Sequence, residues 1–252
     1  MKLVKTGLRP LDKALGGVRE KSLILLHEED PRSLGKLMAL EVLREKLDGG
    51  HLVGYFNLGM PISVLFELFD KMGIDYRRAF DEDRFFLVDT FGSIYGQRVD
   101  FENVQYLRTP VSLETLNDRY IEVIREHKRR WAEKGMFEGR ELWGITVSNS
   151  DYKWIFGEEP TLRYLELVDA QRHTADVYRK YPSGTNLWVY SGVDRVILPF
   201  LYRKADYVLK TGSSIEGDKV VRNLIVVKAP ELEDILSFEY AVRDHRIIFE
   251  EF

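Results

Sequence analysis

The sequence of 252 residues contains no cysteine. This absence excludes a disulfide framework, a thiolate zinc site and a cysteine nucleophile, and it is typical of proteins in a reducing compartment, so we expect a cytoplasmic location. Glutamine is rare as well and occurs only at positions 97, 105 and 171, whereas Glu, Lys and Arg are frequent. That bias indicates a heat-adapted source.

An excess of positive charge is also lacking. The sequence has 37 Lys and Arg residues against 41 Asp and Glu residues, which gives a net charge of −4. Proteins that bind nucleic acid through its phosphates usually carry a basic surplus. We therefore expect no nucleic-acid partner.

Long hydrophobic runs are missing too. The apolar stretches are short, for example Leu23 to Leu26, and residues 1–5 lack the pattern of a signal peptide, so we expect no membrane partner. With 44% hydrophobic and 31% charged residues, the composition is that of a globular protein. We find no internal repeat and no Pro/Gly/Ser-rich linker, and we expect a single domain over residues 1–252.

Segments with the character of strands alternate with segments of helical periodicity over the first three quarters of the chain. Strands that alternate with helices of ten or more residues favour a parallel sheet covered on both faces. The expected strands are 22–26, 51–56, 85–88, 142–147 and 187–190, and the expected helices are 34–47, 64–72, 113–134 and 162–178.

The last part of the chain has a different pattern. Short apolar segments follow one another without helices between them, and turn residues separate them. We expect antiparallel strands here, added to the edge of the parallel sheet. These strands are 205–210, 220–228, 237–242 and 246–250, with turns at 213–218 and 243–245.

The loop after the first expected strand half matches a phosphate-binding P-loop. Its residues 30–37 read D-P-R-S-L-G-K-L, whereas the P-loop pattern is G-x-x-x-x-G-K-[ST]. Gly35 and Lys36 are in place, but Asp30 stands at the first glycine and Leu37 at the Ser/Thr position. The candidate phosphate-binding residues are Ser33, Gly35 and Lys36.

The residues before this loop carry a family resemblance. Positions 6–17 match T-G-x-x-x-L-D-x-x-L-G-G, and positions 205–209 and 222–228 match A-D-x-[VI]-[IL] and R-x-L-x-V-x-K. The sequence thereby resembles the RecA-fold ATPases of the KaiC and RadA type, and most of all KaiC-like paralogues of hyperthermophilic archaea. The resemblance implies an α/β RecA-like P-loop NTPase fold, with a mostly parallel central sheet flanked by helices and antiparallel C-terminal strands.

The sequence departs from the family at the residues that bind nucleotide. Asp30, beside Glu28 and Glu29, puts carboxylates where the phosphates should lie. At about 4 Å and an effective dielectric constant near 20, each contact between like unit charges would cost about 4 kcal/mol. Leu37 has no hydroxyl, so the usual magnesium ligand is missing.

The residues that hydrolyse ATP in the family are replaced as well. The glutamate pair that polarises the attacking water falls on Gly59 and Met60, and the Walker B aspartate falls on Ser148-Asn149-Ser150. The arginine of the family's trailing K-x-R-G is lost from 228–230. We therefore expect a degenerate, non-catalytic member with no cofactor, in which Ser33, Gly35 and Lys36 are the remains of a P-loop.

Several other features allow two interpretations. Lys36 either pairs with Asp30 or Glu29, which we favour, or binds a different anion. Asp89 and Asp151 follow strands, where they cap helices or hold a metal. The basic run 125–131 is the charged outer face of a helix or a nucleic-acid contact. The F-x-x-A sequence at 238–241 packs in the sheet, or hooks one subunit onto the next as in RecA-fold recombinases.

These observations leave three functional hypotheses. The first is a non-catalytic interaction protein that binds a protein or peptide segment, or a second copy of itself. The second is a nucleotide-binding regulator, or a weak ATPase of the KaiC/RadA type, that uses Gly35 and Lys36. The third is an enzyme with chemistry rebuilt around Asp89 and Asp151.

Overall fold

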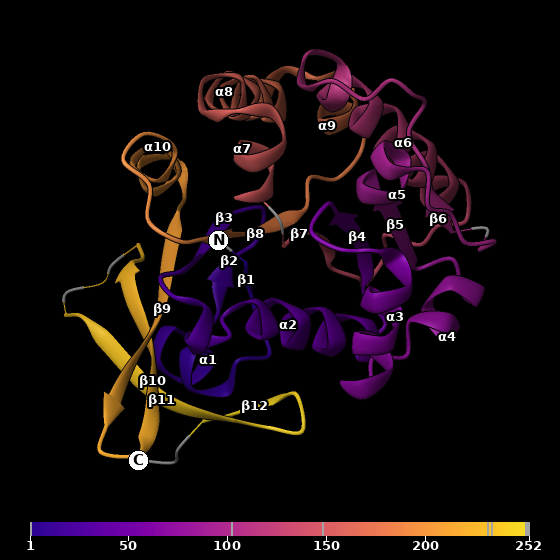
Figure 1. Ribbon diagram of the computed structural model, residues 1–252. Coiled ribbons are helices and arrows are strands. Elements are labelled where there is room, and N and C mark those ends of the chain that lie inside the picture. Colours follow the sequence, from indigo (N-terminus) through magenta and orange to yellow (C-terminus); the bar gives the residue numbers. More distant parts are fainter. Residues whose placement is uncertain (1, 102, 148, 231, 233, 250–252) are drawn as a thin grey trace.

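The structure is a computed structural model that describes residues 2–101, 103–147, 149–230, 232 and 234–249. A large sheet runs through the molecule (Figure 1). The strands of this sheet are β3 (Leu23–Glu28), β4 (Leu52–Asn57), β5 (Phe85–Asp89), β6 (Val104–Gln105), β7 (Leu142–Thr146), β8 (Thr185–Ser191), β9 (Tyr207–Glu216), β10 (Lys219–Lys228), β11 (Leu236–Arg243) and β12 (Arg246–Phe249).

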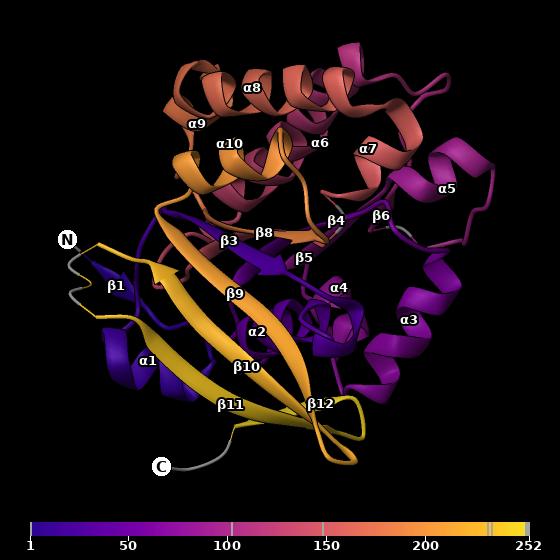
Figure 2. The same cartoon turned by 60° about the vertical axis from the view of Figure 1, so that its left-hand side comes forward.

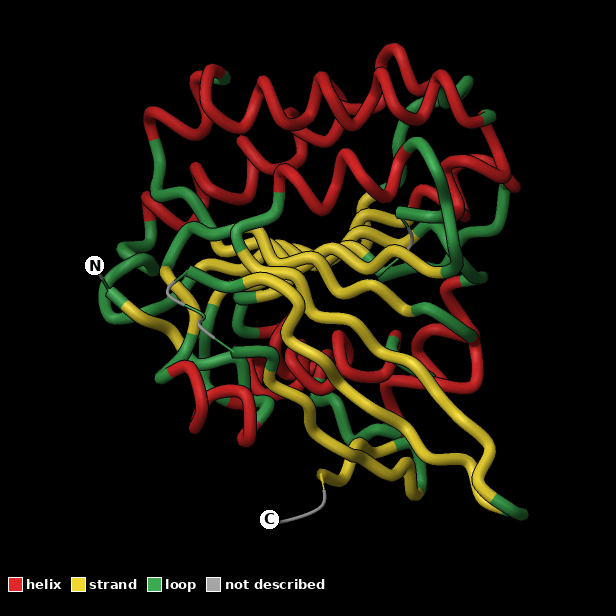
Figure 3. Tube along the Cα trace, turned by 90° about the vertical axis from the view of Figure 1, so that its left-hand side faces the viewer, coloured by secondary structure: helices red, strands yellow, loops and turns green. Residues whose placement is uncertain are grey.

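Parallel pairing forms the centre of the sheet. The strands lie in the order β9-β3-β8-β7-β4-β5-β6, and each neighbouring pair is parallel. β10, β11 and β12 continue from β9 with antiparallel pairing (Figure 3), and β12 lies against α2, where Glu41 accepts hydrogen bonds from Arg246 and Ile247. The expected fold class, a mostly parallel sheet with antiparallel C-terminal strands, is confirmed. The organisation as one domain stays a prediction.

Helices cover both faces of the parallel strands, as Figure 2 shows. One face carries α1 (Arg9–Leu15), α2 (Lys36–Asp48), α3 (Ile62–Lys71) and α4 (Tyr76–Asp81). The other face carries α6 (Leu113–Glu133), α7 (Asp151–Phe156), α8 (Glu158–Thr174), α9 (Asp176–Lys180) and α10 (Ile197–Lys204). The remaining short elements are β1 (Leu3–Val4), β2 (Val18–Arg19), the 3₁₀ helix η1 (Pro31–Ser33) and α5 (Thr90–Tyr95).

Two hydrophobic cores lie on the two faces of the sheet. Along β3, Ile24 and Leu26 face the core on the α2 side, whereas Leu23 and Leu25 face the core on the α6 side. All six residues of β3 are buried. A strand covered on both faces needs apolar residues at successive positions, which explains its run of hydrophobic side chains.

Two expectations about element boundaries are wrong. The expected helix 162–178 is divided at Ala175, which has extended backbone angles and separates α8 from α9. The expected turn 213–218 is mostly strand, because β9 continues to Glu216 and the turn is confined to Gly217 and Asp218. Residue 250, the end of the last expected strand, lies outside the described residues. No helix in the described ranges is both long and apolar enough to span a membrane.

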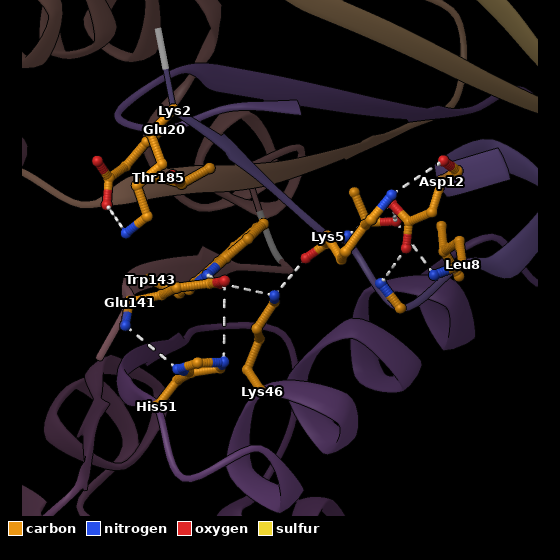
Figure 4. A network of polar contacts seen from close by, with 12 residues as sticks. Lys2, Lys5, Leu8, Asp12, Glu20, Lys46, His51, Glu141, Trp143 and Thr185 are labelled. Carbon is orange, nitrogen blue, oxygen red and sulfur yellow. Dashed lines mark hydrogen bonds and ion pairs between the residues drawn. The ribbon is translucent and has the colours of Figure 1, made fainter. Parts of the chain in front are cut away.

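The residues that match the T-G-x-x-x-L-D pattern have a structural role. The carboxylate of Asp12 accepts hydrogen bonds from the backbone N–H of Thr6 at 2.8 Å, the hydroxyl of Thr6 at 3.0 Å and the N–H of Gly7 at 2.8 Å. Figure 4 shows Asp12 on α1 beside the segment that precedes it. These residues therefore fasten the N-terminal segment to α1.

A buried ion pair links α2 to β7 (Figure 4). The ammonium of Lys46 lies 2.7 Å from Glu141 Oε2, which also accepts a hydrogen bond from Trp143 Nε1 at 2.8 Å. Lys46 additionally donates to the carbonyl of Lys5 and lies over the ring of Trp143. The N-terminal segment, α2 and β7 thus meet at one charged group.

Candidate functional site

The candidate phosphate loop joins β3 to α2 at the carboxyl ends of the parallel strands. Open α/β sheets place ligands at this edge. β3 ends at Glu28, η1 follows, and α2 begins at Lys36. Ser33, Gly35 and Lys36 therefore lie on one short loop, next to the start of a helix.

Asp30 is bonded within the loop. Its carboxylate accepts hydrogen bonds from the N–H groups of Arg32 at 2.9 Å and Ser33 at 3.2 Å. It also accepts from the N–H of Ser213 at 2.8 Å and from the hydroxyl of Ser213 at 2.7 Å. Burial alone would raise the pKa of Asp30, but these four hydrogen bonds lower it below its ordinary value. The group is ionised and holds the loop against β9.

Glu28 occupies the start of α2. It is 6% exposed, and its Oε1 accepts a hydrogen bond from the N–H of Lys36 at 3.2 Å. Its Oε2 accepts from the hydroxyl of Ser191 at 2.6 Å. The first N–H groups of a helix attract anions. In this protein a carboxylate of the chain itself lies there.

The remaining N–H groups of the loop donate to backbone carbonyls. Leu34 donates to Pro31 at 3.2 Å, Leu37 to Leu34 at 3.0 Å, and Met38 to Gly35 at 2.9 Å. Taken together, the loop N–H groups that donate within the protein are those of Arg32, Ser33, Leu34, Lys36, Leu37 and Met38.

Side chains of the C-terminal strands β9, β10 and β11 form hydrogen bonds with the loop. The Tyr240 hydroxyl on β11 donates to the carbonyl of Ser33 at 2.6 Å, and Arg222 Nε on β10 donates to the carbonyl of Arg32 at 2.7 Å. On β9, Thr211 Oγ1 lies 3.1 Å from Ser33 Oγ. Three strands from the end of the chain therefore contact a loop from its beginning.

The three candidate residues have different surroundings. Ser33 is fully buried, and its hydroxyl donates to the carbonyl of Asp30 at 2.7 Å. Gly35 packs against β9 so closely that a Cβ atom would lie 2.2 Å from Thr211 Oγ1. Lys36 is half-buried, and its ammonium makes no hydrogen bond or ion pair with the part of the chain that the structure describes.

The expected pairing of Lys36 with Asp30 or Glu29 is wrong. Glu29 instead pairs with Lys210 at 3.1 Å. Lys210 lies opposite His27 in the register of β3 and β9, and His27 is two residues before Glu29 along the chain.

Asp89 acts as a helix cap. Its Oδ1 accepts hydrogen bonds from the N–H of Gly92 at 3.0 Å and from Asn57 Nδ2 at 2.8 Å. Asp89 is fully buried, and burial raises its pKa. Asp151 is the first residue of α7. Within the described ranges, no group of three or more His, Cys, Asp or Glu side chains is arranged to hold a metal ion.

The positions at which the RecA-fold ATPases that the sequence resembles carry catalytic carboxylates follow β4 and β7, at the same edge of the sheet. Gly59 is exposed, and the carbonyl of Met60 accepts a hydrogen bond from Asn57 Nδ2 at 2.8 Å. Ser148 lies outside the described residues. Asn149 is buried, and its N–H donates to the carbonyl of Val189 at 3.2 Å.

The basic run on α6 faces two ways. Arg129 is exposed and pairs with Glu126 and Glu133, as expected for a charged outer face. Lys128 and Trp131, however, are 3% and 1% exposed, so the expectation is wrong for them. Helical spacing could have revealed this, because residues 124, 128 and 131 lie on one face of a helix.

Two solved structures show what the chain is similar to. An uncharacterised protein from Pyrococcus horikoshii, PH0321, was crystallised in complex with an unknown peptide. It is 37% identical, with a TM-score of 0.90, and the match covers 98% of this chain and 100% of that chain. The chain belongs to the PH0321 family. No protein-family model and no curated protein matches the sequence.

The second structure is similar to this chain in fold. A KaiC-like protein from the same hyperthermophilic archaeon, PH0186, is 12% identical, with a TM-score of 0.73, and the match covers 99% of each chain. At this identity the likeness concerns the fold. The expected resemblance to KaiC-like proteins is confirmed at that level.

The F-x-x-A segment of this PH0321 relative lies within β11. Phe238 and Tyr240 both pack against the core on the α2 side, because alternate residues of a strand point to the same face. The interpretation as sheet packing is therefore supported by the position of both rings.

Proposed function

We propose that this protein is a non-catalytic RecA-fold protein that binds a peptide or protein segment, and that its own carboxylates fill the phosphate loop. One observation carries the proposal. The carboxylate of Glu28 accepts a hydrogen bond from the N–H of Lys36, and the carboxylate of Asp30 accepts hydrogen bonds from the N–H groups of Arg32 and Ser33. In a working P-loop such N–H groups face the phosphates of the nucleotide. A nucleotide would have to displace two anions to reach them.

The residues at the catalytic positions support the absence of ATPase activity. Leu37 cannot ligate magnesium through a hydroxyl, and Gly59 and Met60 cannot polarise water through a carboxylate. Asn149 supplies an amide where the family has an acid. We therefore expect no release of phosphate from ATP above the buffer control.

A peptide is the proposed partner because of the relative. PH0321 was crystallised with an unknown peptide, and this chain matches it along its whole length. Hydrophobic side chains at the carboxyl edge offer a contact surface: Trp154 on α7 is 83% exposed and Val193 after β8 is 80% exposed. An ion pair between the neighbouring residues Lys153 and Asp194 holds these two segments together. Tryptophan is often the anchor of such interfaces, so we propose Trp154 as a peptide contact.

A nucleotide-binding regulator is the second candidate. One observation favours it: the ammonium of Lys36 stands at the start of α2 without a hydrogen bond or ion pair to the described residues. A lysine at this position contacts phosphates in working P-loops.

Self-association, the other form of the interaction hypothesis, would appear as a second species in light scattering.

Calorimetric titration with ATP and ADP, with and without Mg²⁺, tests the filled loop. We expect no binding to the wild type tighter than about 1 mM. The double variant Glu28→Ala/Asp30→Gly removes both internal anions, and we expect it to bind at least about tenfold more tightly. Glu29→Gln is the matched control, because it removes one negative charge beside the loop without freeing an N–H group.

A dissociation constant of about 10 μM or tighter for the wild type would favour the nucleotide-binding regulator, because it requires about 7 kcal/mol of binding free energy. If the binding free energy gained for each negative charge removed is the same in the double variant and in Glu29→Gln, net charge rather than the occupied N–H groups determines binding.

Native mass spectrometry of the purified protein tests peptide binding. We expect peptide adducts after incubation with a mixed peptide library, and fewer adducts with Trp154→Ala. The control is Ile235→Ala, which removes another side chain that is 76% exposed, on a different part of the chain. The absence of peptide adducts under all conditions would contradict peptide binding. An equal decrease in adducts for Trp154→Ala and Ile235→Ala would contradict the role of Trp154.

A further inference from the structure

A cavity of about 270 Å³ lies between the sheet and the helices on the α6 side. Two strand glycines form its floor: Gly54 of β4 and Gly144 of β7 are partners in the register of these strands. A Cβ atom at Gly54 would lie 2.5 Å from Phe86 Cζ, and one at Gly144 would lie 2.7 Å from Asn186 Oδ1. The paired glycines leave this part of the sheet without side chains, which creates the hollow.

The cavity is separate from the phosphate loop. Its lining includes Lys21 and Ser183, which precede β3 and β8, so it reaches the amino edge of the sheet, whereas the loop lies at the carboxyl edge. A smaller chamber of about 70 Å³ shares residues with it and continues beneath α6 and α8. Known ligand sites usually measure about 300 to 1,000 Å³, so the cavity is suited to a small ligand.

The walls are apolar, but the charged groups on them are all positive. The apolar lining is Phe56, Phe86, Ile124, Trp131, Leu142 and Trp143. The charged lining is Lys21, Lys128 and Arg172. Neither an aspartate nor a glutamate lines either chamber, as far as the chain is described.

None of these three cations forms an ion pair with a carboxylate of the described residues. Lys128 donates one hydrogen bond, to the carbonyl of Pro182 at 2.8 Å, and burial lowers the pKa of its ammonium to about 8. Arg172 lies over the ring of Trp188 and makes no hydrogen bond to the described residues. The acids nearest to it are already bonded: Asp169 pairs with Lys204 at 2.6 Å, and Asp206 accepts from the N–H of Leu23 at 2.7 Å.

We propose that this cavity binds a small organic acid with an apolar body, of the arylalkyl or branched alkyl carboxylate class. The carboxylate pairs with the Arg172 guanidinium, whose planar fork matches it, and with the second positive charge of Lys128. The apolar body lies on the two glycines, between the aromatic walls. The proposal is independent of the peptide surface at Trp154.

Calorimetric titration of the full-length protein with 3-phenylpropionate tests the site. The neutral 3-phenylpropan-1-ol has the same apolar body without the charge, and we expect it to bind at least about tenfold more weakly than the acid. Arg172→Met should lower the affinity for the acid at least about tenfold. The matched control is Arg125→Met, which removes an exposed arginine of α6 that does not line the cavity.

A second comparison identifies the source of the acid. The tripeptide Gly-Gly-Phe with a free C-terminal carboxylate presents the same chemistry at a peptide terminus. The same tripeptide with an amidated C-terminus lacks the negative charge and is its control. Tighter binding of the free tripeptide than of 3-phenylpropionate assigns the cavity to a peptide C-terminus, and the reverse assigns it to a free acid. Both results support the site.

The proposal is overturned if the acid and the alcohol bind equally, or if neither binds at about 10 mM. It is also overturned if Arg172→Met behaves like Arg125→Met while remaining folded by circular dichroism. If Arg172→Met does not fold, the comparison of acid with alcohol on the wild-type protein decides the question without any variant.

Discussion

Replacement of Lys46 by methionine keeps the length of a buried side chain but removes its charge. Lys46 is 3% exposed, and its ammonium lies 2.7 Å from Glu141 Oε2. In the variant, the Glu141 carboxylate still accepts the hydrogen bond from Trp143 Nε1 at 2.8 Å and still lies 3.8 Å from the ring of His51. It loses its ion pair with a lysine ammonium. Loss of one member of a buried ion pair costs about 3 to 5 kcal/mol. The Glu141 side chain retains 17% exposure, so we expect the lower end, about 3 kcal/mol.

Urea unfolding at neutral pH measures this loss as a lower midpoint with an unchanged slope. For a protein of this size, about 3 kcal/mol corresponds to a melting temperature lower by roughly 6 to 12 °C. Lys71→Met is the matched control. Its partner in the ion pair is Glu67, and the two side chains are 50% and 64% exposed, so we expect no measurable change.

The pH dependence of the difference gives an independent check. Burial opposes ionisation of Glu141, but Lys46, Trp143 and His51 together lower its pKa below the ordinary value. The stabilisation is therefore present above the pKa of the unfolded chain, about 4.3, and is lost as the pH falls through the lower pKa of the folded protein. The difference in free energy of unfolding between wild type and Lys46→Met should therefore become smaller in that pH range. The reasoning is refuted if Lys46→Met costs no more than Lys71→Met at neutral pH.

Two further substitutions test carboxylates that hold loops. Asp12→Ala removes three hydrogen bonds to Thr6 and Gly7 and should cost about 1 to 2 kcal/mol in urea unfolding, whereas an unchanged midpoint would show that the N-terminal segment is held by packing alone. Asp194→Asn tests the low pKa of Asp194. Burial alone would raise this pKa, but hydrogen bonds from Lys153 and from two backbone N–H groups lower it to about 2. Its stabilisation, about 2 kcal/mol, is present above about pH 3.9 and lost as the pH falls through 2, so the variant should be less stable than wild type at pH 7 and nearly equal to it near pH 2.

The sheet could be predicted from the sequence because its signals are local. Runs such as 22–26 are apolar at successive positions, and the helices between them have the spacing of one buried face. The short helices α4, α5 and α7 have six residues each, too few for periodicity to identify them. Ala175 divides α8 from α9 although its side chain favours helix, so the break depends on tertiary packing.

The carboxylates of the candidate loop could be predicted, but their partners could not. Glu28 and Asp30 are visible in the sequence beside Gly35. Their hydrogen bonds to Ser191 and Ser213 depend on strands more than 150 residues away, as the separations of 163 and 183 show. Sequence proximity therefore predicted a pairing of Lys36 with Glu29 or Asp30 that the structure does not have, because Lys210 and Ser213 bond these two carboxylates instead.

The orientation of α6 was only partly predictable. Lys128 stands in a run of basic residues, and composition alone suggests that it faces solvent. The cavity beneath it depends on Gly54 and Gly144, which lie on two strands that are neighbours in space but separated by β5, β6 and α6 along the chain. No local pattern links these glycines to Lys128.

The carboxylates that accept the N–H groups of the candidate phosphate loop are covalent parts of the chain. Glu28 and Asp30 lie eight and two residues from the N–H groups of Lys36 and Arg32 from which they accept hydrogen bonds, so their effective concentration there is on the order of millimolar or higher and does not depend on the concentration of the protein. Dialysis, dilution and exchange of buffer anions leave that concentration unchanged. An external phosphate competes at this loop with a ligand that cannot diffuse away.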